Sequence, residues 1–81
     1  MKKEYTETQQ IEMVNKDGYV IKFINNPNEK IQELAVKQDG YILYYIKNPS
    51  EKVQEIAIRQ NGYAIEYIKN PSEKIRKLAL I

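Results

Sequence analysis

Apolar side chains recur along this chain in a block that repeats every 22 residues, as from Ile31 to Val53. In the central copy, Val53, Ile56 and Ala57 follow the i, i+3, i+4 spacing of one helical face, and Gln60 continues it at i+7. The same face occurs one period earlier, at Ile31, Leu34 and Ala35. It occurs again one period later, at Ile75, Leu78 and Ala79. We therefore predict a helix of about three turns in each copy, with this face buried between neighbouring copies.

A shorter apolar segment follows each of these helices. In the central copy it covers residues 63–70, where Tyr63 and Tyr67 are an i, i+4 pair and so are Ala64 and Ile68. These pairs favour a second helix of about two turns, which ends before the next proline because the residue before a proline avoids the helical region. A strand at residues 65–67 is the alternative, and it would give a parallel β-solenoid.

All the glycines and prolines of the chain mark the same period. They are Gly18, Gly40 and Gly62, and Pro27, Pro49 and Pro71. We expect each glycine to adopt the left-handed conformation that ends a helix. We expect the next helix to begin at the Asn-Pro pair, with Asn48 or Ser50 as N-cap and Glu51 in the first turn.

These elements predict an all-α fold, an α-solenoid of about three and a half stacked 22-residue helix–turn–helix repeats. Residues 1–81 form a single domain, divided into units 5–26, 27–48 and 49–70 and a half unit 71–81. The first unit is the least regular, because Tyr5 stands at the proline position and Gln9 and Glu12 replace aliphatic residues. We expect this unit to cap the stack at its N-terminal end.

Residues 48–62 read NPSEKVQEIAIRQNG, and residues 26–40 and 70–80 carry the same residue classes. This block resembles the short α-helical solenoid repeats of the leucine-rich-repeat-variant and HEAT-like kind. It is also similar to 22-residue repeats of uncharacterised proteins from bacteria, phages and large viruses. The resemblance covers nearly the whole chain and implies protein binding, in some families nucleic-acid binding, without shared catalytic residues. The phage relatives also imply a small inhibitor of a host defence effector of the CRISPR type.

Composition narrows the functional classes further. Thirteen basic and eleven acidic residues give a net charge of +2, too mild to indicate nucleic acid or a membrane surface as partner. The chain has no histidine and no cysteine, which removes the usual general bases, thiolates and soft-metal ligands. We therefore expect no enzyme, no metal and no cofactor. With no export signal and no apolar run near ~20 residues, we expect a cytoplasmic protein, in the host cytoplasm if a phage encodes it.

The aromatic residues repeat in two columns, and two functions suit them. They can pack between layers with their hydroxyls bonded or hydrated, or they can form a stacking platform for single-stranded nucleic acid. Phe23 favours packing, because a phenylalanine at the position of Tyr45 and Tyr67 shows that this column does not require a hydroxyl. The columns are Tyr19, Tyr41 and Tyr63, and Phe23, Tyr45 and Tyr67.

The second helix of each unit also presents outward columns. The column of Lys22, Tyr44 and Glu66 changes in every unit while the framework around it repeats. Positions that vary on a repeating scaffold are where a particular partner can be recognised, and Tyr44 is the strongest candidate. We predict a partner-binding surface made of Lys22, Tyr44, Lys47, Glu66 and Lys69.

The last half unit stays apolar where a terminal cap should turn polar. We predict that Ile75, Leu78, Leu80 and Ile81 are covered by a second copy in a homodimer around a two-fold axis, with the binding target as the alternative occupant. The function expected is thus a non-enzymatic protein-binding module. The alternatives left open are a single-stranded nucleic-acid-binding repeat protein and a fragment of a longer structural solenoid.

Overall fold

The computed structural model describes residues 4–80, and all their regular structure is helical. Four α-helices alternate with three 3₁₀-helices in this part of the chain. The elements are α1 (Glu7–Lys16), η1 (Gly18–Phe23), α2 (Glu29–Gln38), η2 (Gly40–Tyr45), α3 (Glu51–Gln60), η3 (Gly62–Tyr67) and α4 (Glu73–Ala79). The all-α prediction is confirmed, and the β-solenoid alternative is wrong for the described residues.

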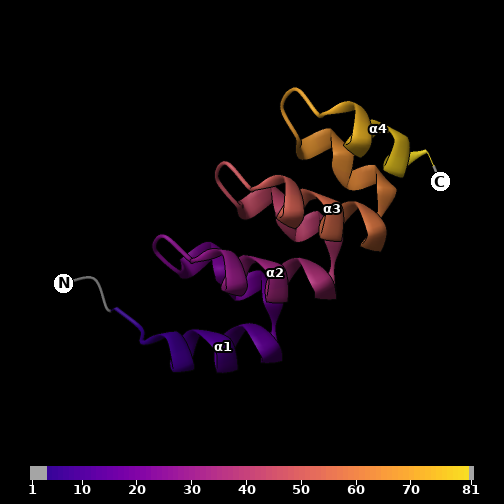
Figure 1. Cartoon of the computed structure of the whole chain (residues 1–81). Helices are drawn as coiled ribbons and strands as arrows, with labels where there is room; N and C mark the ends of the chain where they lie inside the picture. The colour runs from indigo at the N-terminus through magenta and orange to yellow at the C-terminus, as the bar shows by residue number, and fades with distance from the viewer. Residues whose placement is uncertain (1–3, 81) are drawn as a thin grey trace.

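The α-helices follow one another as successive steps of a stack, with α1 at one end and α4 at the other (Figure 1). Each α-helix contacts the next α-helix in the sequence, and each 3₁₀-helix lies against the α-helices before and after it. The stack measures 41 × 21 × 16 Å. Contacts join only neighbouring units, which is the arrangement of a solenoid.

The second helix of each unit is a 3₁₀-helix, where the sequence predicted two turns of α-helix. Its hydrogen bonds span three residues, as from the Ile24 amide to the Ile21 carbonyl at 3.0 Å. Its buried residues include three that lie three positions apart, Gly40, Leu43 and Ile46, with Ile42 buried beside them. That spacing is the sequence signal for a 3₁₀-helix, because side chains three apart eclipse in this helix.

The left-handed residues of the chain are asparagines, which corrects the role expected for glycine. No glycine in residues 4–80 has a positive φ, whereas Asn26, Asn48 and Asn70 have φ values of 52°, 51° and 55°. Each of these asparagines precedes a proline and makes the turn from a 3₁₀-helix into the next α-helix. Asparagine is the non-glycine residue that adopts this conformation most readily.

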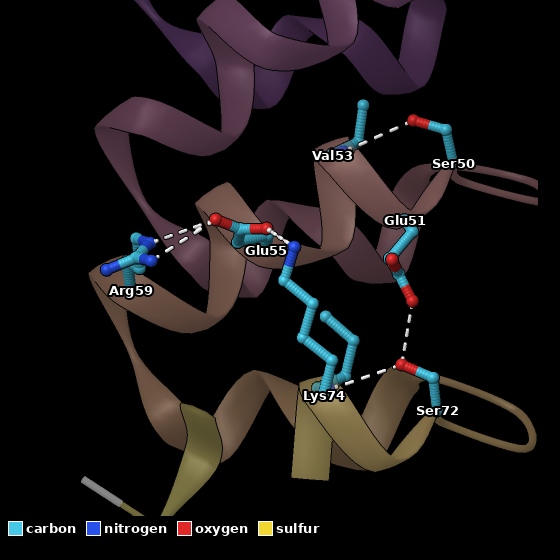
Figure 2. A network of polar contacts seen from close by, with 8 residues as sticks. Ser50, Glu51, Val53, Glu55, Arg59, Ser72 and Lys74 are labelled. Carbon is cyan, nitrogen blue, oxygen red and sulfur yellow. Dashed lines mark hydrogen bonds and ion pairs between the residues drawn. The ribbon is translucent and has the colours of Figure 1, made fainter. Parts of the chain in front are cut away.

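Each α-helix starts at a side-chain cap, and from α2 onwards the cap also bonds the preceding unit. The cap of α3 is Ser50, and neither Asn48 nor Pro49 takes part in the helix. The Ser50 hydroxyl accepts from the Val53 amide and donates to Glu29 Oε2 at 2.5 Å. Figure 2 shows the next copy of this contact, in which the Ser72 hydroxyl donates to Glu51 at 2.7 Å. The caps therefore join neighbouring helices as well as starting them.

Ion pairs add a second link between neighbouring α-helices. Lys74 Nζ lies 3.0 Å from Glu55 Oε1, and Arg59 of the same helix as Glu55 pairs with its Oε2 at 3.2 Å (Figure 2). Hydrogen bonds from Lys74 and then Arg59 lower the pKa of Glu55, and the same contact raises the pKa of Lys74. Lys52 pairs with Glu33 one unit earlier at 3.4 Å. The ion pairs made by Lys52 and Lys74 therefore both run from one unit to the preceding one.

The core is a continuous seam between the layers. The apolar face of the α-helices is buried or half-buried in it, and so is a second aliphatic series made of Val14, Val36 and Ile58. Leu80, the last member of that second series, is 86% exposed. The fully buried members are Val14, Ile31, Ala35, Val36, Val53, Ala57 and Ile75.

Candidate functional site

Five tyrosines of the 3₁₀-helices form a continuous line of ring contacts, here named the tyrosine strip. Neighbouring ring centroids are 6.1 Å apart for Tyr19–Tyr45, 5.0 Å for Tyr45–Tyr44, 5.3 Å for Tyr44–Tyr67 and 5.9 Å for Tyr67–Tyr41. All four pairs meet edge to face, a favourable geometry because the edge and face of an aromatic ring carry opposite partial charge. The strip therefore runs across three units.

The repeat places these rings, because rings of one unit reach rings of the next unit. The tyrosine after the glycine in one unit contacts the last ring of the following 3₁₀-helix, as Tyr19 contacts Tyr45 and Tyr41 contacts Tyr67. Tyr44 of η2 likewise reaches Tyr67 of η3. The prediction that aromatic residues pack between layers is correct for these contacts, but they lie at the surface of the stack.

Lys22 occupies the place in the first unit that Tyr44 occupies in the second. Its ammonium nitrogen lies 5.2 Å from the ring centroid of Phe23 and 5.6 Å from that of Tyr45. Tyr44 makes the corresponding contacts with the rings of Tyr45 and Tyr67. Lys22 therefore contacts two successive aromatic rings by cation–π interactions, and Tyr44 contacts the next two by ring–ring interactions.

The strip is open to solvent although its members touch one another. Tyr44 is 64% exposed and Phe23, beside Lys22, is 71% exposed, while Tyr41, Tyr45 and Tyr67 each expose more than a third of their surface. Aromatic residues held in a fixed arrangement at a surface are typical of protein interfaces, where they supply contact area at low cost in side-chain entropy.

Tyr19 anchors one end of the strip through its hydroxyl. It donates a hydrogen bond to Asp39 Oδ2 at 2.5 Å, and this bond to a carboxylate raises the pKa of Tyr19 to about 12. Asp39 Oδ1 also accepts from the Tyr41 amide at 3.0 Å. One carboxylate therefore holds the ring of one unit and caps the 3₁₀-helix of the next.

The structure brings together only part of the predicted partner-binding surface. Lys22 and Tyr44 lie within the strip, and Glu66 is exposed at the corresponding position of η3. Lys47 and Lys69 are exposed after η2 and η3, outside the ring contacts. For Tyr45 and Tyr67 the sequence favours packing between layers and leaves a stacking platform open, and their recurrence beside a variable column is the signal that points to a surface site.

The predicted dimer surface is also divided. Ile75 is fully buried within the chain and Leu78 is half-buried, so Ile75 covers the preceding unit and cannot reach a partner. Leu80 is exposed beside a hollow of about 670 Å³ that Gly62, Tyr63 and Ala79 help to line. Ile81 lies outside the described residues. The dimer stays a prediction.

In residues 4–80, no group of three or more carboxylate, histidine or cysteine side chains is placed to hold a metal ion. None of the helices in that range is both long enough and apolar enough to cross a membrane.

Comparisons with protein-family models, with curated proteins and with solved structures give no match to this chain. The geometry described above is therefore the basis for assigning a function.

Proposed function

We propose that this protein is a non-enzymatic binding module that contacts a protein partner through the tyrosine strip and Lys22. The observation that carries the proposal is the exposed, mutually packed line of five tyrosines. Tyrosine is enriched at protein interfaces and among the residues that dominate their binding energy. Because the rings already hold one another in place, they lose little freedom when a partner binds.

Single-stranded nucleic acid is the second candidate, since tyrosines beside lysines can stack on bases. The strip suits it less well. Base stacking needs free ring faces, whereas the rings of Tyr45 and Tyr67 are each met by two other tyrosines. Binding of a phosphate backbone also needs a track of basic residues, whereas the positive charge of Lys22 is accompanied here by the negative charges of Asp39 and Glu66.

The more specific form of the proposal is a small cytoplasmic inhibitor of a host defence effector, encoded by a phage. It rests on the phage sequences that the repeat is expected to resemble. A cell-based interference assay tests it. Expression of the wild-type chain should block a CRISPR-type effector, and the Tyr44→Ala variant should not.

Site-specific photo-crosslinking tests the general proposal. A benzophenone side chain placed at position 44 keeps an aromatic group in the strip, and one placed at position 37 lies on the exposed surface of α2 as the control. In an extract of the source cells, position 44 should capture one protein that position 37 does not. Its purified form should then bind the Tyr45→Ala variant at least about tenfold more weakly.

Two outcomes would contradict the proposal. One is equal capture from both positions. The other is micromolar binding of labelled single-stranded oligonucleotides at about 50 mM salt that falls steeply at about 200 mM salt, because that loss indicates phosphate contacts.

A further inference from the structure

We propose that the hollow beside Leu80 is a second docking surface, which takes a short turn of a partner protein that carries an aspartate, an aliphatic residue and a tyrosine. This hollow, here named the end hollow, has a volume of about 670 Å³. Its walls come from η3 and from the end of α4, and they include Gly62, Tyr63, Ile65, Arg76, Ala79 and Leu80. None of these residues belongs to the tyrosine strip, so the inference goes beyond the proposed function.

The repeat shows which kind of segment such a surface takes. The corresponding surface of the first unit lies on η1 and α2, and η2 packs against both. There the Tyr19 hydroxyl donates to Asp39, and the Tyr19 ring meets the ring of Tyr45. Ile42 lies over Gly18, with its Cδ1 atom 2.7 Å from the place that a Cβ atom on the glycine would take. The covering segment therefore supplies a carboxylate, an aliphatic side chain and an aromatic ring.

The matching side chains of the last unit lie open to solvent. Tyr63 is 72% exposed, whereas Tyr41 one unit earlier is 36% exposed and meets the ring of Tyr67. Ile65 is half-buried, whereas Leu43 at the same position of η2 is 1% exposed. The end hollow thus presents the side chains that the preceding unit covers with a 3₁₀-helix.

Arg76 adds a charge that the repeat does not carry. The three preceding α-helices have glutamine at this position, and each glutamine donates to a backbone carbonyl just before its own helix, as Gln54 does to Pro49 at 3.0 Å. Arg76 is exposed, and it is the one charged residue among the described residues that line the end hollow. A cation beside apolar walls complements a carboxylate on an apolar segment, so the surface favours aspartate at the position that Asp39 has in the chain.

A second copy of this chain suits the end hollow less well than a different protein does. The stretches with the required pattern are residues 17–23, 39–45 and 61–67, and their aliphatic residues are used in their own stack, as Ile42 is with 0% exposure. A two-fold axis through the end hollow would also set Arg76 against the Arg76 of the other copy. The occupant is therefore a segment of a partner protein.

A peptide with the sequence of residues 39–45, DGYILYY, blocked at both ends, is the probe for this surface. Heteronuclear NMR of the 81-residue chain detects its binding through shifts of backbone amides, even where the affinity is weak. The amides of Gly62, Tyr63 and Ala79 should shift. Those of Gly18 and Gly40 are internal controls and should not shift, because the chain's own 3₁₀-helices cover the corresponding surfaces.

Variants of the peptide and of the chain test the charge pairing. Asp39→Asn in the peptide should weaken binding to the wild-type chain about tenfold. The Arg76→Gln chain has the glutamine of the repeat, so it should fold, and it should bind these two peptides with affinities within about threefold of each other. Tyr45→Ala in the peptide should weaken binding to both chains. The Tyr44→Ala chain is the control outside the end hollow and should bind the parent peptide as the wild type does.

Three results would overturn the inference: no shifts at the end hollow, shifts centred on the tyrosine strip, or an equal effect of Asp39→Asn on both chains. A dimer in sedimentation that Leu80→Glu makes monomeric would also overturn it, because a second copy would then cover the end hollow. The proposed function stands in each case if position 44 still crosslinks a protein selectively. Loss of that crosslink, with the shifts at Gly62 retained, removes the proposed function alone.

Discussion

The carbonyl oxygen of Ala57 lies over Gly40, at a place that a Cβ atom on residue 40 would have to share. The same relationship joins Gly18 to Ala35 and Gly62 to Ala79, with 3.0 Å between the carbonyl oxygen and the Cβ position in both. Glycine therefore recurs once in every unit because a 3₁₀-helix touches the backbone of the next α-helix there.

Replacing Gly40 by alanine should destabilise the protein strongly, and valine should do so more. The added Cβ overlaps backbone atoms, which cannot move aside as a flexible side chain can, so we expect a loss of at least ~2 kcal/mol in the free energy of unfolding. Gly62→Ala is the matched control and should lose less, because its closest approach is 3.0 Å. Thermal unfolding measures both.

The Gly40→Asn variant distinguishes a steric need for glycine from a need for a positive φ at position 40. Asparagine tolerates a positive φ but has a Cβ atom, so Gly40→Asn should be as harmful as Gly40→Ala. A normal melting temperature for Gly40→Asn would contradict the steric account.

At position 48 the backbone conformation, rather than the space for a side chain, should decide which substitutions are tolerated, because Asn48 has a φ of 51°. Asn48→Gly should leave the melting temperature nearly unchanged. Asn48→Ala should lower stability by about 1 kcal/mol, since alanine pays the steric cost of the left-handed region. Equal stability of the two variants would show that the turn before Pro49 can adopt another conformation.

Ser50 caps α3 and donates a hydrogen bond to Glu29, and asparagine is a substitution that should keep both interactions. Asn28 caps α2 through its side-chain oxygen and donates from its side-chain nitrogen to Glu7, so Ser50→Asn should be tolerated. Ser50→Ala removes the cap and the donor, and we expect it to cost about 1 kcal/mol or more. Ser50→Asp keeps a cap but sets a carboxylate against Glu29, and it should fall between the other two variants. Urea unfolding at low salt measures the order, and a variant with alanine as stable as that with asparagine would contradict it.

The hydrogen bond from Tyr19 to Asp39 should be visible in an alkaline titration. The pKa of this phenol is raised from its ordinary value of 10.0 to about 12, so one tyrosine should ionise at about pH 12 in absorbance measurements. Between pH 10 and pH 12 the folded chain keeps a proton that the unfolded chain has released. Stability should therefore be complete below pH 10 and decline as the pH rises through this range.

Asp39→Asn removes the carboxylate, and Tyr19→Phe removes the titrating group. Both variants should lose the step near pH 12, and their stability should depend less on pH in that range. A step that persists in Asp39→Asn would assign the shift to another group.

The stacked architecture could be predicted from the sequence because it depends on residues that repeat. Val53 and Ala57 mark a helical face, and their copies one period away show that the face must be buried against a similar one. The conformations within a unit were harder to predict. Glycine after a helix indicates a left-handed end in most proteins, and nothing local to Gly40 reveals the approach of Ala57.

The candidate site was only partly predictable for a related reason. Tyr44 was singled out because it breaks the repeat, and the structure places it at the centre of the strip. Tyr45 and Tyr67 obey the repeat, which favours packing between layers and does not mark them as part of a binding surface. Their contacts join rings from different units, and the register of one unit on the next is set by tertiary packing rather than by local spacing.

The serine caps give the stack an order of assembly. The hydroxyl that starts α3 is held by Glu29 of α2, and the hydroxyl that starts α4 is held by Glu51 of α3, so each acceptor is earlier in the chain than its donor. A ribosome makes the acceptor helix first. Each helix start therefore finds its acceptor on a segment that the ribosome has already made, and synthesis extends the protein in the direction in which its helices are linked.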